Sequence, residues 1–417
     1  MATVVLVGTL DTKGGEYAFL RERVGAAGCD VILVDAGITA VSSEADVSAD
    51  EVAAAADEDR SALAAANDRG SAVAAMTRGA TVVVKRLHDE GRLDAILGIG
   101  GSGGSSIVST AMQALPIGVP KLLVSTMASG DTSPYVGTSD IAMMYSVVDV
   151  AGINGISERI LTNAAAAAAG MAITAAGFSS TITPKPLIGA TMFGVTTPCV
   201  TTARERLEAL GYEVLVFHAT GTGGRSMEAL MQAGFITGAL DVTTTELVDE
   251  LVGGVLSAGP ERLEAAGSLG IPQVVSLGAL DMCNFGPRET VPDRFEDRNL
   301  YIHNPTVTLM RTTQEECAEL GRIIARKLNS AMGPLTLFIP LGGVSMIDVP
   351  DAPFYDPAAD AALVEELKAG LRPDIEVVEM ALDELFETTR SGAIYDAKTL
   401  ILVQALMLRE TTERKAP

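Results

Sequence analysis

The stretch GIGGSGGSSI at residues 98–107 decides how the first part of this chain folds. It follows the apolar run LDAILGI (93–99), typical of a buried strand, and precedes VSTAMQAL (108–115), typical of a helix. Glycines before a helix N-terminus let the backbone approach an anion, and the unpaired N–H groups there carry partial positive charge. The alternative is a tight turn where helix and strand pack closely. We favour a phosphate-binding turn made by Gly100, Gly101, Ser102, Gly103, Gly104, Ser105 and Ser106.

Strand and helix patterns alternate on both sides of this turn. TVVLVG (3–8), CDVILVDAG (29–37) and KLLVS (121–125) are further short strand-like runs. Between the first two of these runs, Tyr17, Leu20 and Val24 recur with the spacing of one helical face. Such alternation predicts a parallel sheet with helices on both faces.

A second unit of the same kind is predicted after TITPKPLIGA (181–190), where two prolines bracket a lysine. RERVGAAGCDVILVD (21–35) and RERLEALGYEVLVFH (204–218) align without a gap. We therefore expect an α/β protein with two Rossmann-like domains, residues 1–184 and 185–417, each a mainly parallel sheet with helices on both faces. Three helix starts are predicted in the second domain: Thr243 with Glu246 and Thr313 with Glu316 as capping boxes, and Asp356 with Pro357.

Composition and charge argue against several classes of partner. The 417 residues carry a formal net charge of −23, which disfavours binding to nucleic acid or to an anionic membrane. The four cysteines are far apart, the start MATVVLVGTLD lacks the features of a secretory signal, and the alanine-rich run at 164–178 is too short to span a bilayer and predicts a buried helix. We expect a cytoplasmic protein without a nucleic-acid or membrane partner.

Two more loops of the first domain carry candidate ligand contacts. In GTLDTKGGE (8–16), Lys13 could neutralise a phosphate, Thr9 and Thr12 could donate hydroxyl groups, and Asp11 could hold a divalent cation. The alternative is that Asp11 or Thr12 only caps the next helix. Asp35 ends a strand where a carboxylate often binds an adenosine ribose. STMASGDTSPYVGTSD (125–140) adds Ser129 and Gly130 as ligand contacts and Asp131 as a metal ligand. Ligands of open α/β sheets lie beyond the carboxyl ends of the strands, so these loops should meet at one crevice.

The second domain has its own glycine-rich loop, HATGTGGRSME (218–228). Arg225 could bind a carboxylate or phosphate with two hydrogen bonds, and His218 could act as an acid or base. His303, in YIHNPTVTLMRTT (301–313), is the other loop histidine of this domain. We name His218, Arg225 and His303 as candidate catalytic residues. The alternatives are structural histidines and an arginine paired with one of the many acidic side chains.

Metal ligation by the protein alone has little support in the sequence. There is no HExxH motif, no EF-hand loop and no cluster of cysteine and histidine. Mg²⁺ usually takes few protein ligands together with phosphate oxygens, so a nucleotide-bound Mg²⁺ is the form we expect.

Together, GTLDTKGGE, GIGGSGGSS, HATGTGGRSMEAL and HNPTVTLMRTT resemble the Tm-1-like ATP-binding family, also called UPF0261. The resemblance runs from about Thr3 to about Leu371. It implies a two-domain Rossmann-like fold, ATP in the N-terminal domain and a homodimer, but no particular reaction. The expected function is an ATP-dependent enzyme acting on a small anionic metabolite in the cleft between domains. The alternative is a nucleotide-responsive regulatory or binding protein without catalysis.

Overall fold

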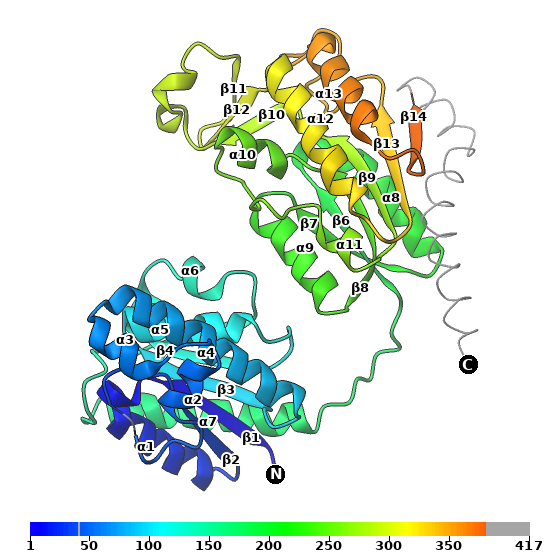
Figure 1. The fold of residues 1–417 in the computed structure, drawn as a ribbon. Helices are drawn as coiled ribbons and strands as arrows, with labels where there is room; N and C mark the ends of the chain where they lie inside the picture. The colour runs from blue at the N-terminus through cyan, green and yellow to red at the C-terminus, as the bar shows by residue number, and fades with distance from the viewer. Residues whose placement is uncertain (41, 381–417) are drawn as a thin grey trace. The chain divides into compact units, whose positions relative to one another are not determined.

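The structure, a computed structural model, describes residues 1–40 and 42–380. The chain forms two compact units, Met1–Ile182 and Thr183–Pro417 (Figure 1). Each has a parallel sheet flanked by helices, which confirms the predicted fold class. None of the helices described has the length and apolar character needed to cross a lipid bilayer.

The first unit has a five-stranded sheet in the order β2-β1-β3-β4-β5, with every pairing parallel. One face packs against α2, α4 and α5, and the opposite face packs against α1 and α7 (Figure 1). The strands are β1 (Thr3–Gly8), β2 (Asp30–Asp35), β3 (Ala95–Gly100), β4 (Lys121–Ser125) and β5 (Ile141–Tyr145). The helices are α1 (Leu10–Ala26), α2 (Ala49–Ala54), α3 (Arg60–Ala66), α4 (Arg69–Asp89), α5 (Ser102–Gln113), the short helix η1 (Thr126–Ser129), α6 (Ser133–Val136) and α7 (Ser157–Ala176).

The alanine-rich segment forms most of α7. Five of its alanines are buried against the sheet, so the prediction of a buried helix is confirmed for this face. Small side chains let the helix approach the strands closely, which suits a chain whose aromatic content is only 4%.

Tyr17 of α1 ties the ends of β1 and β3 together. Its hydroxyl accepts from the Ile99 amide at 2.9 Å and donates to the Val7 carbonyl at 2.5 Å. A Cβ at Gly8 would lie 1.9 Å from this hydroxyl, so only glycine fits beside the ring. The contact fixes the two strand ends from which the loops of the candidate site begin.

The second unit has a six-stranded parallel sheet in the order β14-β13-β9-β8-β6-β7. Helix α8 packs on one face, while α9 to α13 contribute to the cores on the other. The strands are β6 (Leu187–Met192), β7 (Glu213–His218), β8 (Ile236–Thr243), β9 (Gln273–Gly278), β13 (Leu335–Pro340) and β14 (Glu376–Met380). The longer helices are α8 (Thr197–Ala209), α9 (Thr222–Gln232), α12 (Gln314–Asn329) and α13 (Pro357–Gly370), and the shorter ones are α10 (Glu246–Val252) and α11 (Ala265–Ser268).

A small antiparallel sheet in the order β10-β12-β11 adds to the second unit, from β10 (Met282–Phe285), β11 (Leu300–Asn304) and β12 (Val307–Arg311). The sequence prediction treated residues 301–313 as a loop, whereas they form most of a β-hairpin. The predicted helix starts at Thr313 with Glu316 and at Asp356 with Pro357 are confirmed.

Both units change direction at an equivalent place. In the first, β2 lies on one side of β1 and the chain then continues with β3 on the other side. In the second, β7 and β8 flank β6 in the same way. Such switch points open a crevice at the carboxyl ends of the strands, where α/β proteins bind ligands.

Candidate functional site

A cavity of about 530 Å³ lies at the switch point of the first unit. Its walls come from the loop after β1, the turn between β3 and α5, the loop after β2, and the α3–α4 region. The lining residues are Thr9, Asp11, Thr12, Lys13, Ile38, Thr39, Leu63, Ala64, Asn67, Asp68, Arg69, Ala72, Val73, Gly101, Ser102, Gly103, Gly104 and Ile107. A volume of this size is within the range of small-molecule sites.

The glycine-rich turn contributes three glycines that have room for a side chain. A Cβ at Gly101, Gly103 or Gly104 would lie 3.8, 3.7 or 3.5 Å from its nearest neighbour. Gly100 differs, because a Cβ there would lie only 2.7 Å from the Ser105 amide. Packing therefore explains Gly100 but not the other three glycines, whose missing side chains leave the backbone accessible from the cavity.

The start of α5 is accessible for the same reason. Gly101 is its N-cap residue, and no side chain provides a capping hydrogen bond. The two serines after the glycines are not part of the cavity wall. Ser105 is buried and bonds Ser125 Oγ at 2.6 Å, and Ser106 is exposed. The cavity therefore meets backbone and Ser102 at this helix start.

In the loop after β1, Thr9, Asp11, Thr12 and Lys13 all line the cavity, as a ligand-binding role requires. Thr9 is the N-cap of α1, and neither Asp11 nor Thr12 provides a capping side chain. The backbone at Lys13 is non-helical, with φ −133°, and its ammonium group donates to the Val150 carbonyl.

Asp11 holds the loop after β2 at the edge of the cavity. Its Oδ2 accepts from the Ile38 amide at 2.9 Å and from the amide and hydroxyl of Thr39 at 3.0 and 2.8 Å. Burial raises the pKa of this carboxyl, but the hydrogen bonds outweigh burial and the net effect is a lowered pKa. Asp11 is therefore an ionised carboxylate whose main contacts are internal.

Asp35 lies outside the cavity wall. It is fully buried and accepts from the amides of Leu10 at 3.1 Å and Gly37 at 2.8 Å. Burial raises the pKa of its carboxyl, and the backbone hydrogen bonds oppose that rise. Through these hydrogen bonds Asp35 joins the loop after β1 to the loop after β2, and its side chain has no exposed surface for a ribose.

Ser129, Gly130 and Asp131 are exposed and do not line the cavity either. Asp131 accepts from the amide and hydroxyl of Ser133, which lowers the pKa of its carboxyl. In residues 1–40 and 42–380 no cluster of three or more His, Cys, Asp or Glu side chains could hold a metal ion. Asp11 lines the cavity and Asp131 does not, and a nucleotide-bound Mg²⁺ held by them stays a prediction.

Among the lining residues that the sequence prediction missed, Arg69 is the basic one. It is the first residue of α4, and its Nη2 lies 3.7 Å from the place of a Cβ on Gly103. Asn67 takes a left-handed conformation, and Asp68 caps α4 through the amides of Gly70 and Ser71. An Asn-Asp pair at the start of a helix could have been recognised as a turn and cap. Its closeness to the glycine turn is a tertiary contact that no local pattern contains.

In the second unit, a carboxylate of the protein itself occupies the glycine-rich turn between β7 and α9. The amides of Gly221 and Gly224 donate to Glu246 Oε1 at 2.6 and 3.1 Å. A Cβ at Gly224 would lie 2.2 Å from Glu246 Oε2, and one at Gly223 would lie 1.8 Å from the His218 carbonyl. An internal carboxylate therefore takes the place that the sequence suggested for an external anion.

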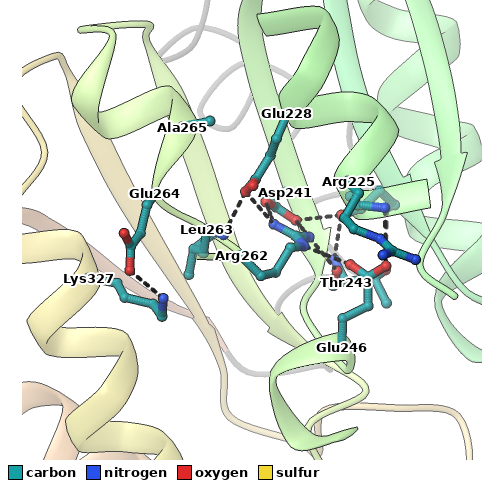
Figure 2. Close-up of polar contacts among 12 residues, drawn as sticks. Arg225, Glu228, Asp241, Thr243, Glu246, Arg262, Leu263, Glu264, Ala265 and Lys327 are labelled. Carbon is teal, nitrogen blue, oxygen red and sulfur yellow. Dashed lines mark hydrogen bonds and ion pairs between the residues drawn. The ribbon is translucent and has the colours of Figure 1, made fainter. Parts of the chain in front are cut away.

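Glu246 is itself held by Arg262, whose side chain is fully buried. Glu246 Oε2 accepts from Arg262 Nε at 2.6 Å, and Asp241 binds the two terminal nitrogens at 2.5 and 2.6 Å (Figure 2). Glu228 completes the cluster at 3.5 Å. Burial raises the pKa of Glu228 to about 7, although the nearby arginine charge opposes that rise.

The predicted capping box of Thr243 with Glu246 is therefore wrong. Thr243 belongs to β8, and α10 begins after Thr245 without a side-chain cap. Glu246 reaches α9 and Arg262 instead, because a buried carboxylate gains more from charged and amide donors than from one local amide.

The three candidate catalytic side chains are exposed but lie in different settings. His218 ends β7 and packs edge-on against Phe193, with ring centroids 5.4 Å apart. Arg225 lies in α9, and its Nε donates to the Gly221 carbonyl at 3.3 Å. His303 lies on β11 of the antiparallel sheet, near Tyr301. Within the residues described, no hydrogen bond or ring contact joins any two of the three.

The fold and the cavity define a two-domain α/β protein with Rossmann-like sheets and an open crevice in its first domain. The chain belongs to the uncharacterised protein family UPF0261: the N-terminal domain of that family matches residues 2–177, and its C-terminal domain matches residues 185–385. The two matches correspond to the two units of the structure.

Named relatives support this membership. A UPF0261 protein of Clostridium tetani is 53% identical over 379 residues, covering 90% of this chain and 93% of the relative. A Rhizobium meliloti UPF0261 protein is 50% identical over 374 residues, with coverages of 88% and 91%. The tomato (Solanum lycopersicum) protein named ToMV resistance protein Tm-1(GCR237) is 50% identical over 284 residues, which are 67% of this chain and 38% of the tomato protein.

Proposed function

We propose that this protein binds ATP in the cavity of its first unit, with the phosphates against the start of α5. The observation that carries the proposal is the set of three glycines, Gly101, Gly103 and Gly104, where a Cβ would make only ordinary van der Waals contacts. Glycine in a helix costs about 0.5–1 kcal/mol relative to alanine. The first turn of α5 contains two such residues that packing does not require, and close approach of a ligand to the backbone accounts for them.

The charges around the cavity support an anionic ligand. The amides at the start of α5 lack a side-chain cap, and Lys13 and Arg69 line the same cavity. The two lining carboxylates, Asp11 and Asp68, accept hydrogen bonds from backbone amides of the protein. The two cations beside an open helix N-terminus therefore form a local attraction for phosphate. Apolar side chains of Ile38 and Leu63 offer a surface for the nucleoside.

Nucleotide binding without a catalysed reaction is the function that the geometry supports best. The alternative, an ATP-dependent enzyme acting on a small anionic metabolite through His218, Arg225 and His303, loses its main support because Glu246 fills the glycine turn of the second unit. A nucleotide-responsive binding protein needs only the cavity of the first unit. An assay for ADP release from ATP separates the two, since the binding protein is expected to show no turnover.

The test of ATP binding is calorimetry on the full chain with Gly103→Val. The Cβ of the new side chain would meet nothing closer than Arg69 Nη2 at 3.7 Å, so we expect the fold to persist while the backbone becomes inaccessible. We expect ATP affinity to fall by more than about tenfold, the equivalent of about 1.4 kcal/mol. Gly170→Val is the matched control, because Gly170 lies in α7 with nothing within 4 Å of its Cβ position and does not line the cavity. Equal ATP affinity in both variants would remove this turn from the site.

A further inference from the structure

We infer that Arg69 recognises the geometry of the ligand's phosphate chain and, together with the charge of Lys13, makes the cavity selective for phosphate over the nucleoside. The inference rests on the proposed function, since it assigns a role within the same cavity. Its starting point is position: Arg69 Nη2 lies 3.7 Å from the point where a Cβ on Gly103 would be. A group that occupies this open point contacts the guanidinium and the first turn of α5 at the same time.

The charge of Arg69 is not used elsewhere in the fold. In the part of the chain that the structure describes, Arg69 forms no ion pair, and its side chain is exposed at the cavity wall. The adjacent carboxylate, Asp68, forms no ion pair with Arg69 among the described residues, and its oxygens are used within its own helix start. Asp68 accepts from the amides of Gly70 and Ser71 and from the Ser71 hydroxyl, which lowers the pKa of its carboxyl.

Lys13, the other cation of the cavity, is already engaged. Its ammonium group donates to the Val150 carbonyl, so part of its hydrogen-bonding capacity is spent on joining the loop after β1 to the segment before α7. Arg69 keeps all five donors of its guanidinium, in a planar arrangement that matches two phosphate oxygens. The guanidinium therefore provides the geometric recognition, whereas Lys13 adds charge.

The backbone places Arg69 firmly even though its side chain is exposed. Asn67 in its left-handed conformation ends α3, and the Asp68 cap then starts α4 so that Arg69 is its first residue. Helix α4 is anchored by eight buried residues along its length, among them Met76, Val83 and Val84. The guanidinium of Arg69 therefore extends from a helix that is packed on the protein core, and it lies beside the glycine turn.

The experiment compares ATP, ADP and adenosine by calorimetry on the wild-type full chain and on Arg69→Gln. Loss of a charge-assisted contact should weaken ATP and ADP by about ten- to a hundredfold. Adenosine affinity should stay within about twofold of wild type, a smaller change than the loss of even one neutral hydrogen bond would cause. Arg69→Lys keeps the charge but not the planar fork, so it should recover only part of the ATP affinity.

Arg78→Gln is the matched control. Arg78 lies on the same helix, and its replacement by glutamine changes the net charge by the same amount. Arg78 pairs with Glu58 and does not line the cavity. If Arg69→Gln and Arg78→Gln bind ATP alike, or if Arg69→Gln weakens adenosine as much as ATP, the role of Arg69 is refuted while ATP binding stands. If the wild type binds no ATP, the proposed function fails and the inference fails with it.

Discussion

Replacing Gly103 by alanine should make the protein more stable and a poorer binder of ATP. Gly103 is the second residue of α5, and a Cβ there meets nothing closer than Arg69 Nη2 at 3.7 Å. Alanine is favoured over glycine in a helix by about 0.5–1 kcal/mol, and here no steric cost offsets that gain. For a unit of this size the gain corresponds to a rise in melting temperature of roughly 1–4 °C.

The same methyl group occupies the point where a phosphate would approach the backbone. Loss of one charge-assisted hydrogen bond costs about 1.5–3 kcal/mol, so ATP affinity should fall at least about tenfold. Thermal unfolding followed by circular dichroism gives the stability, and calorimetry gives the affinity. Stability and binding are thus expected to change in opposite directions.

Gly100→Ala is the matched control on the same turn. Its Cβ would lie 2.7 Å from the Ser105 amide and 2.8 Å from the Gly104 carbonyl carbon, so this variant should lose stability. A lower melting temperature for Gly103→Ala would refute the inference that a Cβ fits at that position without strain. A higher melting temperature with unchanged ATP affinity would refute the proposal that Gly103 is glycine because a phosphate approaches the backbone there.

Three further predictions concern the two glycine turns and the charges near them. Lys13→Ala should weaken ATP binding by about 1.5–3 kcal/mol more than adenosine binding. Equal losses of ATP and adenosine affinity in calorimetry would mean that Lys13 acts only on the fold, through its hydrogen bond to Val150. Gly224→Ala should destabilise the second unit by more than about 2 kcal/mol in urea unfolding, because its Cβ would displace the buried carboxylate of Glu246; a neutral effect would contradict the packing. The pKa of Glu228, raised by burial from 4.5 to about 7, means that the folded state holds a proton that the unfolded state releases, so stability should fall as pH rises from about 5 to 8. Glu228→Gln should flatten this dependence, and an unchanged slope would exclude Glu228 as its source.

The sequence predicted the architecture well because the patterns involved are local. Short apolar strands and capped helices have signatures a few residues long, and the caps at Thr313 and Asp356 were found in this way. The hairpin formed by β11 and β12 was missed, although Asn304 and Pro305 at its tip are a recognised turn signal.

The candidate site was predicted only in part, because it depends on contacts between distant segments. GIGGSGGSS and HATGTGG look alike as glycine-rich turns before helices, yet the first opens on a cavity and the second encloses Glu246. The contact of Glu246 with Arg262 also explains why a capping-box spacing failed there. Local spacing gives no information on which carboxylate or cation the fold brings to a turn, so Arg69 and Glu246 could be recognised only in three dimensions.

Backbone amide NMR on the full chain labelled with ¹⁵N-glycine tests the difference between the two turns most directly. Resonances of Gly101, Gly103, Gly104, Gly221 and Gly224 are assigned by single replacements and followed during a titration with ATP. The account predicts saturable shifts for Gly103 and Gly104 at the open start of α5, and none for Gly221 and Gly224, whose amides already bind Glu246. Shifts confined to the second pair, or no shift in either pair at saturating ATP, would contradict it.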